Sequence, residues 1–342
     1  MKIKSKILIL LSLSILFLSC SPGAENLGVF APSRLDHVDG QDGVTPVVFT
    51  DTHTMWTFGD TIMGEKMIPN SLAFSPKLNE DNVRHPDFTY YRENGKIVPF
   101  IRYKKGEDPH KVRLWALDGV KLGNTMYVYY LEMKVLEEGN PFGFAMEGIG
   151  LARWDIPGGW EVGDRVDFKR LKNLFPRGYP AFGACVMHRD GYVYTIGQFA
   201  RKDLTSPVKI ARVPDDRIAD PGAYTFLRKD GEWVDHIEKA SPFLNDVAGE
   251  CSLSYNEYFG QYMIVYCQTF NGKITVVRFN DFSMLDGAGK TVVYTAPKLK
   301  SDDPNKPGWY YSGKEIYSHE DSLYSLYIHP LKYQPILLKV SL

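Results

Sequence analysis

Three acidic side chains, Asp42, Asp118 and Glu250, are the leading candidates for chemistry in this sequence of 342 residues. Each occupies the corresponding position of a pattern that recurs along the chain. Two carboxyl groups, one protonated and one ionised, can cleave a glycosidic bond by acid and base chemistry. Like charge and partial burial raise one carboxyl pKa enough to keep that group protonated near neutral pH. We therefore expect Asp42 to act as base or nucleophile, Asp118 to orient the sugar and modulate its neighbour, and Glu250 to be the general acid.

A structural role for the acidic residues stays open. Aspartate before glycine is a common turn residue, and both Asp42 and Asp118 are followed by glycine. Asp60, in the segment Phe-Gly-Asp-Thr, either contacts a ligand or fixes a turn. Asp36 and Asp39 could join Asp42 around a cation, but their segment lacks the full calcium-loop pattern, so we expect no metal site there.

Arginine and aromatic side chains supply the other groups that bind sugars. A guanidinium donates hydrogen bonds to hydroxyl groups, and an aromatic face covers the apolar face of a sugar ring. Candidates of these two types are Trp56, Arg113, Trp115, Arg153 and Tyr311. Most other aromatic residues are expected to pack in the protein interior.

Short strands must position these residues, because the sequence lacks long helical periodicity. Aromatic and β-branched runs alternate with turn dipeptides such as Asp190-Gly191 and Asn271-Gly272. A small or polar entry, an inner strand, a turn and a tyrosine-rich second strand recur five times along the chain. The second strands are expected at residues 55–59, 126–131, 192–197, 262–267 and 323–328.

The recurring unit predicts an all-β fold, a single five-bladed β-propeller that spans residues 29–342. The landmarks Asp42, Asp118, Phe182, Glu250 and Gly313 are 76, 64, 68 and 63 residues apart, which fits blades of four strands. A pair of β-sandwiches is the competing fold. In a propeller the inner strands surround one funnel, so carboxylates at the starts of inner strands would meet there.

Charge and motifs exclude several classes of protein. Lysine plus arginine total 40 against 41 aspartate plus glutamate, so nucleic-acid binding is not indicated. The chain has no nucleophile elbow, P-loop, dinucleotide fingerprint or His-Glu-x-x-His motif. Cys185 and Cys251 have no candidate base beside them in the sequence, so a thiol nucleophile is unsupported. Cys251 and Cys267 flank an apparent hairpin, where a disulfide and two buried thiols are equally open.

The first 28 residues are expected to lie outside the fold. Three lysines precede an apolar stretch that is too short to cross a bilayer, as in a secretory signal. The stretch ends in Leu-Phe-Leu-Ser-Cys, which resembles a bacterial lipoprotein signal with Cys20 as the acylated residue. We expect a signal peptide at 1–19, a tether at 20–28 and a lipid anchor in the outer membrane of the cell envelope. An ordinary secretory signal is the alternative.

Several segments resemble, in order, one bacterial family. Segment 54–61, TMWTFGDT, resembles the Trp-x-Phe-Gly-Asp-Thr signature of the domain-of-unknown-function family 4185. Segment 113–119, RLWALDG, resembles that family's Trp-Pro-Leu-Asp-Gly, with Ala116 in place of the usual proline. Further matching segments are 149–153, 209–214 and 252–256, so the similarity extends over nearly the whole chain after the signal.

The resemblance implies a carbohydrate-active propeller. The family is similar in fold to five-bladed glycoside hydrolases, among them arabinanases and fructosidases, and some members are described as endo-acting on D-arabinan. This implies cleavage of an extracellular polysaccharide, preferably an arabinan-like furanose glycan, with no required cofactor. A non-catalytic glycan-binding lipoprotein is the alternative, and a structural component of an uptake assembly is a weaker third interpretation.

The resemblance adds two candidate residues. The comparable hydrolases take their general acid from the third blade, whereas Glu250 lies in the fourth, which makes Glu147 the substitute acid. Related propellers place a histidine near a central calcium ion. His319, in the last blade, is therefore a candidate ligand-binding residue, and a structural calcium is the one metal that the resemblance allows.

Overall fold

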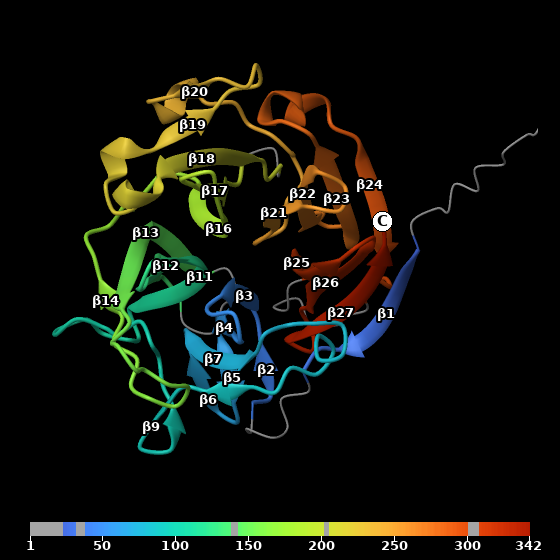
Figure 1. Ribbon diagram of the computed structural model, residues 1–342. Coiled ribbons are helices and arrows are strands. Elements are labelled where there is room, and N and C mark those ends of the chain that lie inside the picture. The colour runs from blue at the N-terminus through green and yellow to red at the C-terminus, as the bar shows by residue number, and fades with distance from the viewer. Residues whose placement is uncertain (1–22, 32–37, 138–142, 202–204, 300–307) are drawn as a thin grey trace, which may run out of the picture.

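The computed structural model describes residues 23–31, 38–137, 143–201, 205–299 and 308–342. Within these residues the regular structure is almost entirely β-strand, which confirms the all-β prediction. Five antiparallel sheets of four or five strands are arranged in a ring around a common centre (Figure 1). We number these sheets one to five by the order of their innermost strands in the chain.

In the first three sheets the strands follow one another outward from the centre of the ring. Sheet 1 contains β3 (Thr45–Val48), β4 (His53–Phe58), β7 (Ser71–Pro76) and β8 (Thr89–Tyr90). Sheet 2 contains β11 (Val112–Leu122), β12 (Thr125–Val135), β13 (Phe144–Asp155), β14 (Lys169–Arg170) and β15 (Phe175–Pro176), the last two both paired with β13. Sheet 3 contains β16 (Ala181–Arg189), β17 (Tyr192–Gln198), β18 (Val208–Pro214), β19 (Thr225–Leu227) and β20 (Trp233–Val234).

The remaining elements complete the ring and its connections. Sheet 4 contains β21 (Ser252–Asn256), β22 (Gln261–Cys267), β23 (Lys273–Phe279) and β24 (Lys290–Thr295). Sheet 5 contains β25 (Tyr311–His319), β26 (Ser322–His329), β27 (Gln334–Ser341) and β1 (Ala24–Val29). There are also two small sheets. In one, β5 (Thr61–Met63) lies between β2 (Gly40–Gln41) and β6 (Lys66–Ile68); in the other, β9 (Arg92–Glu93) pairs with β10 (Lys96–Ile97). Short 3₁₀ helices are η2 (Asp215–Arg217), η3 (Pro221–Ala223), η4 (Ile237–Lys239) and η5 (Phe282–Gly287).

The second strand of each large sheet lies where the sequence predicts it, in β4, β12, β17, β22 and β26. These strands are buried on both faces, because each large sheet packs between two neighbours. Their continuous apolar runs therefore replace the alternation of a half-exposed strand. Tyrosines of these strands are buried in the interior, among them Tyr129, Tyr130, Tyr194, Tyr266 and Tyr327.

Five apolar clusters fill the five spaces between neighbouring sheets. The cluster around Met55 and Trp154 joins sheets 1 and 2, and the cluster around Tyr129 and Phe182 joins sheets 2 and 3. Equivalent clusters join sheets 3 and 4, sheets 4 and 5, and sheets 5 and 1. Because every space in the ring is filled, the sheets fix one another and leave the starts of their innermost strands at one centre.

The N-terminal strand completes the last sheet. β1 pairs with β27, and the Asn26 amide Nδ2 donates to the Tyr294 hydroxyl of sheet 4 at 2.9 Å. The predicted tether at 20–28 is therefore wrong for its second half, because residues from Ala24 onward form a paired strand.

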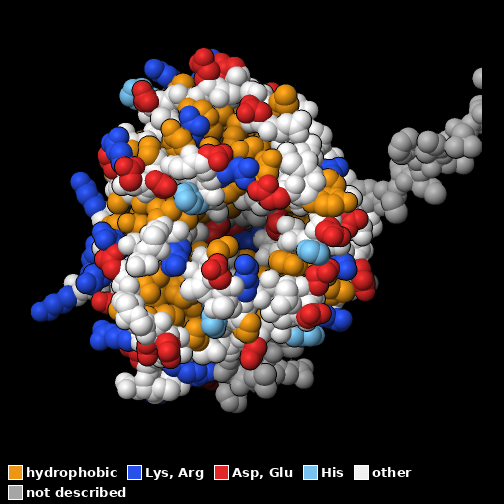
Figure 2. Space-filling model, viewed as in Figure 1, with side chains coloured by type: hydrophobic (Ala, Val, Ile, Leu, Met, Phe, Trp, Pro, Cys, Tyr) orange, Lys and Arg blue, Asp and Glu red, His pale blue; other side chains and the backbone are white. Residues whose placement is uncertain are grey.

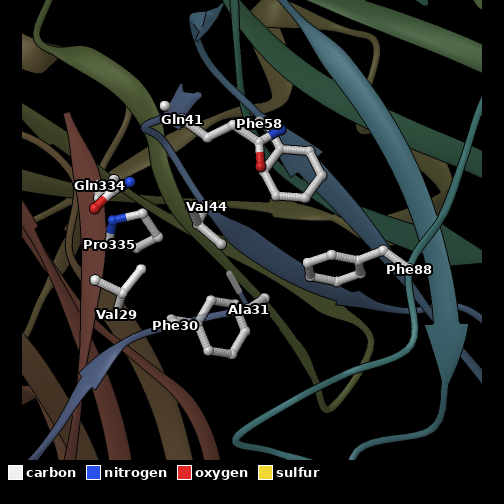
Figure 3. A pocket seen from close by; sticks show the side chains of 10 residues that line it. Val29, Phe30, Ala31, Gln41, Val44, Phe58, Phe88, Gln334 and Pro335 are labelled. Atoms are coloured by element: carbon white, nitrogen blue, oxygen red, sulfur yellow. The ribbon is translucent and has the colours of Figure 1, made fainter. Parts of the chain in front are cut away.

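A cavity of about 10 Å³ remains beside the end of β1, lined by apolar side chains such as Phe30 and Phe58 (Figure 3). It has room for one water molecule at most.

The cysteines of the described residues are unpaired and buried. Cys251 packs in the cluster between sheets 3 and 4, whereas Cys267 packs in the cluster between sheets 4 and 5. The two thiols face opposite sides of one sheet, so the open disulfide alternative for this pair is wrong.

Among the described residues, none of the helices has the length and apolar character needed to cross a membrane.

The role of β1 in closing the ring is testable by truncation. A variant that lacks residues 1–29 loses the outer strand of sheet 5, whereas a control that lacks residues 1–22 keeps it. We expect the first variant to melt about 5–10 °C below the control, because it loses a row of strand hydrogen bonds and exposes part of β27. Equal melting temperatures in differential scanning calorimetry would contradict this role.

Candidate active site

A cavity of about 820 Å³ opens at the starting ends of the innermost strands. It is lined by six of the residues selected from the sequence, namely Asp42, Asp60, Arg113, Trp115, Glu250 and Tyr311. The centre of the ring is hollowed in the face seen in Figure 2, and acidic and basic side chains surround the hollow. The cavity therefore gathers the candidate carboxyl groups of sheets 1 and 4.

Asp42, just before β3, is the most heavily hydrogen-bonded of these carboxyl groups. Its Oδ1 accepts from the backbone N–H of Asp60 at 2.8 Å. Its Oδ2 accepts from the hydroxyls of Tyr311 at 3.0 Å and Tyr333 at 2.7 Å. Desolvation by burial, and then the charge of Glu250, raises the pKa of Asp42 to about 6, although the two tyrosine hydroxyls oppose this rise.

Asp60 follows β4 and lies beside Asp42. Its Oδ1 accepts from the Trp115 indole Nε1 at 3.0 Å, and its Oδ2 lies 3.4 Å from the Tyr333 hydroxyl oxygen. Burial first, and then the negative charge of Asp42, raises the pKa of Asp60 to about 8, against the lowering effects of Trp115 and Arg113. At neutral pH Asp60 is therefore mostly protonated while Asp42 is mostly ionised.

Glu250 reaches the same place from the start of sheet 4. Its Oε2 accepts a hydrogen bond from the Ser312 hydroxyl. A side chain added at Gly43 would place its Cβ 3.4 Å from Glu250 Oε1, so the carboxylate extends to the backbone that carries Asp42. The three carboxyl groups thus form one cluster, although they are separated by up to 208 positions in the chain.

Asp118 is not part of this cluster, which corrects the prediction that it lies beside Asp42. β11 begins at Val112, so Asp118 stands in its second half, at a register shift between Ala116 and Gly119. It lines a separate cavity of about 690 Å³ at the opposite ends of the innermost strands. Its oxygens accept from the backbone N–H groups of Gly119 at 2.7 Å and Val186 at 2.6 Å.

These bonds make Asp118 a link between sheets 2 and 3. Burial raises its pKa to about 7, while the two backbone donors and the Lys314 charge lower it. The Lys314 Nζ is itself buried and donates to Thr45 Oγ1 at 2.7 Å. Asp118 and Lys314 therefore have a structural role, as buried polar side chains of the interior.

Four other predicted ligand-binding residues lie away from the cavity. Trp56 is a wrong prediction, because it is fully buried between Phe30 and Phe88 and its indole donates to Ser75 Oγ at 2.9 Å. The other three are exposed residues. Glu147 forms a surface ion pair with Arg177 at 3.7 Å and Arg153 one with Asp155 at 2.8 Å, while His319 Nε2 lies 3.8 Å from Glu80 Oε2. None of these three lines the large cavity.

Two further predictions concern lipidation and metal binding. Cys20, the predicted site of lipidation, lies outside the described residues. In the described part of the chain there is no group of three histidine, cysteine, aspartate or glutamate side chains that could hold a metal ion. A structural calcium stays a prediction from the resemblance.

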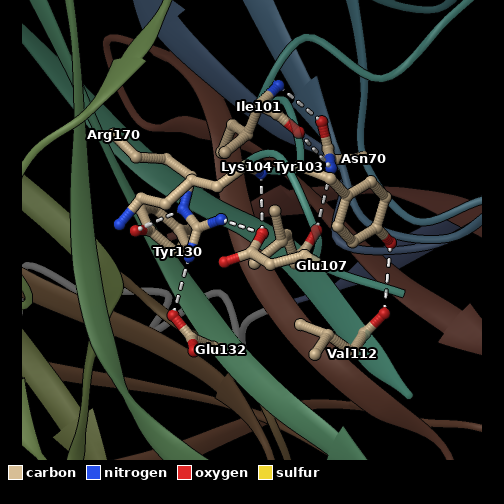
Figure 4. A network of polar contacts seen from close by, with 10 residues as sticks. Asn70, Ile101, Tyr103, Lys104, Glu107, Val112, Tyr130, Glu132 and Arg170 are labelled. Atoms are coloured by element: carbon tan, nitrogen blue, oxygen red, sulfur yellow. Dashed lines mark hydrogen bonds and ion pairs between the residues drawn. The ribbon is translucent and has the colours of Figure 1, made fainter. Parts of the chain in front are cut away.

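A buried polar network fixes the segment that leads into β11 (Figure 4). The Asn70 amide Nδ2 donates to the backbone oxygen of Leu114 at 2.9 Å. The Arg170 guanidinium forms ion pairs with Glu107 at 2.5 Å and Glu132 at 2.8 Å, and only 4% of its side chain is exposed. These contacts hold the start of β11, from which Arg113 and Trp115 project into the cavity.

The sequence gives little sign of two residues that hold the carboxyl groups. Tyr333 lies in the turn between β26 and β27, and Ser312 lies near the start of β25, neither within a recognisable motif. The only signal for Ser312 is its place at the entry of the fifth repeat. Tyr333 could not have been found without knowing that the last turn meets the first sheet.

Comparisons with known proteins agree with this architecture. A candidate hydrolase from Bacteroides ovatus is 14% identical with a TM-score of 0.66, covering 92% of this chain and 87% of its own. An endo-arabinase from Bacteroides thetaiotaomicron is 12% identical with a TM-score of 0.53, covering 92% and 97%. A family 117 glycoside hydrolase from Zobellia galactanivorans is 10% identical with a TM-score of 0.53, covering 94% and 90%.

These likenesses define the class as an all-β ring of the kind found in glycoside hydrolases. The chain itself belongs to the family described as Domain of unknown function (DUF4185), which matches residues 37–342. This confirms the resemblance seen in the sequence. No curated protein matches the chain.

The raised pKa of Asp60 predicts how stability depends on pH. The folded carboxyl keeps its proton up to about pH 8, whereas the unfolded one loses it near 3.8, so stability falls as pH rises through this interval. Replacing Asp60→Asn removes the cost of ionising a buried group. We expect this variant to melt above the wild type at about pH 8–9 and close to it at about pH 4, as measured by calorimetry.

Substitution of the exposed Asp51→Asn serves as the control. It should leave the melting temperature of the protein unchanged at both pH values. If the melting temperature of the Asp60→Asn variant differs from that of the wild type by the same amount at both pH values, the ionisation of Asp60 does not destabilise the folded protein.

Proposed function

We propose that the protein is a glycoside hydrolase in which the five sheets are the blades of one five-bladed β-propeller. The observation that carries the proposal is the pairing of a protonated Asp60 with an ionised Asp42 at the floor of an open cavity. Hydrolysis of a glycosidic bond needs one carboxyl group in each state. The likeness to glycoside hydrolases supports the same class of reaction.

Asp60 is the proton donor in this proposal and Asp42 the nucleophile. One Tyr333 hydroxyl oxygen lies 2.7 Å from Asp42 Oδ2 and 3.4 Å from Asp60 Oδ2. Two carboxyl oxygens at these distances from one hydroxyl oxygen lie closer together than the roughly 6.5–9.5 Å of inverting enzymes, which favours a retaining reaction. Asp60 gives its proton to the leaving oxygen as the glycosidic C–O bond breaks. Asp42 forms a bond to the sugar carbon as the leaving group departs. Water then attacks the same carbon and gives a proton to the ionised Asp60, and the bond to Asp42 breaks to regenerate its carboxylate.

Glu250 has a supporting role in this arrangement. Its negative charge raises the pKa of Asp42, which makes Asp42 a stronger nucleophile when ionised. Glu250 as the general acid, the role expected from the sequence, is the competing assignment. The two assignments differ in which variant recovers activity on a substrate whose leaving group needs no proton.

We infer an extracellular polysaccharide as substrate, with an arabinan-like furanose glycan preferred. Family membership and the likeness to an endo-arabinase support this choice. The half-buried Trp115 ring, beside Phe144 at a centroid distance of 5.0 Å, offers an apolar surface for a sugar next to the carboxyl groups. Export and a lipid anchor at Cys20 would place the enzyme at the outer membrane, where such a polymer is available.

The hydrolase proposal predicts product release from a panel of polysaccharides. The wild type should release oligosaccharides from arabinan-type polymers, as measured by chromatography of the reaction. Asp42→Asn should lower kcat by about 10²–10⁴-fold, because the nucleophile is lost. Asp118→Asn, which changes a buried carboxyl outside the cavity, should keep the activity per folded molecule. Binding of a polysaccharide without any product would instead show a glycan-binding protein.

The acid assignment predicts a selective recovery. Asp60→Asn should lose activity on the polysaccharide but recover it on an aryl glycoside of the same sugar, because a good leaving group needs no proton. Glu250→Gln should show no such recovery. If Glu250→Gln is the variant that recovers, Glu250 is the general acid and Asp60 is not.

The two pKa values predict a bell-shaped pH dependence. Activity requires Asp42 ionised, so it rises as pH passes about 6, and Asp60 protonated, so it falls as pH passes about 8. The profile of kcat/KM should therefore peak near neutral pH. A profile that rises steadily up to pH 10 would rule out Asp60 as the acid.

A further inference from the structure

Two residues beside the carboxyl cluster have an unusual backbone conformation. Ser312 has a φ angle of 54° and Tyr333 a φ angle of 52°, in the left-handed region that side chains rarely adopt. They are two of eight such non-glycine residues in the described parts of the chain. Backbone strain of this kind persists where the surrounding structure enforces it, and it concentrates at functional sites.

Ser312 is held in this conformation by contacts on both sides. Its backbone N–H donates to Ala248 O at 2.8 Å, and a register shift in β25 lies between Tyr311 and Lys314. The side chain is 1% exposed and its hydroxyl donates to the Glu250 carboxylate. Glycine would adopt the same backbone without strain, but glycine carries no hydroxyl.

Tyr333 is held in a similar way in the turn at the same end of sheet 5. Its N–H donates to His329 O at 2.8 Å, and its backbone oxygen accepts from Gln41 N–H at 2.9 Å, next to Asp42. A Cβ added at Gly40 would lie 2.7 Å from this oxygen, so the turn and the first sheet are in close contact. From this position the Tyr333 hydroxyl reaches Asp42 at 2.7 Å.

We propose that Ser312 and Tyr333 are positioning residues, which sheet 5 contributes in order to hold the carboxyl groups of Glu250 and Asp42 in a fixed orientation in the cavity. Both side chains donate to a carboxylate, and a hydrogen bond to an ionised group favours its charged form. The Tyr333 hydroxyl lies closer to Asp42 than to Asp60, so it favours the ionised form of Asp42 more strongly. The proposal rests on the hydrolase function proposed above, and it explains why two positions with a backbone suited to glycine carry hydroxyl side chains.

The groups that face Asp42 are known, so the effect of each hydroxyl can be separated. The acidic neighbours are Asp60 and Glu250, and the donors are the hydroxyls of Tyr311 and Tyr333. Arg113 acts on Asp60 from sheet 2. Removing one hydroxyl leaves these other groups in place.

Ser312 is tested with a pair of variants that both lose the hydroxyl. Ser312→Gly also removes the backbone strain, whereas Ser312→Ala keeps it, so the glycine variant should melt above the alanine variant. Both should lose kcat by about tenfold or more with little change in KM. Glu320→Gly is the matched control, because Glu320 has a φ of 50° in an exposed turn; it should keep the full kcat.

A purely structural Ser312 would give a different result. The more stable Ser312→Gly would then have the kcat of the wild type, and this outcome would overturn the proposal for Ser312.

Tyr333 is tested with Tyr333→Phe, which keeps the ring and removes only the hydroxyl. Loss of this donor should raise the pKa of Asp42, so the acid limb of the kcat/KM profile should move up by about one pH unit. The same rise should appear in a ¹³C NMR titration of the Asp42 carboxyl, which requires no substrate. An unchanged titration would overturn the proposal for Tyr333.

The titration also distinguishes failure of the hydrolase function from failure of the positioning role of Tyr333. A wild type that releases no sugar, together with a raised Asp42 pKa in Tyr333→Phe, would refute the hydrolase function and leave the hydroxyl's effect on Asp42 intact. An active wild type with an unchanged titration would refute the positioning role alone.

Discussion

Burial of the neighbouring carboxyl groups of Asp42 and Asp60, together with the repulsion between nearby negative charges, is the constraint on which the rest of the site depends. Two neighbouring carboxyl groups that are both desolvated resist ionising together at neutral pH. One must keep a proton, and Asp60, with a pKa of about 8, is that group. Different donors surround each carboxyl group. Hydroxyl groups donate hydrogen bonds to Asp42 and Glu250, and the Trp115 indole donates one to Asp60. The same burial and repulsion that lower the stability of the fold produce the mixed protonation that glycosidic cleavage needs.

Only a closed ring can hold such a cluster together. The acidic residues come from sheets 1 and 4, and most of the hydroxyl donors come from sheet 5. Each pair of neighbouring sheets shares an apolar cluster, and β1 completes the last sheet against β27. The free energy of these five packed spaces offsets both the repulsion and the strained backbone at Ser312 and Tyr333. The packed sheets thus stabilise a centre that is itself destabilising.

The repeat in the sequence predicts much of this arrangement, and its failures have physical reasons. Asp42 and Glu250 meet because each stands just before its inner strand. Asp118 does not join them, because β11 starts at Val112 and an extra residue shifts the register near Asp118. Trp56 lies in a strand buried on both faces, which a local motif cannot distinguish from a cavity wall. Tyr333 acts across the junction of the last and first sheets, a contact that no local pattern encodes.

The central claim is that one carboxyl group of the cluster keeps its proton at neutral pH while its neighbour is ionised. A ¹³C NMR titration of protein labelled at the aspartate carboxyl carbons measures this directly, with Asp42→Asn and Asp60→Asn variants to assign the signals. The account predicts that Asp42 titrates near pH 6 and Asp60 near pH 8. Titration of both groups at or below about pH 4, the range of exposed aspartates, would contradict it.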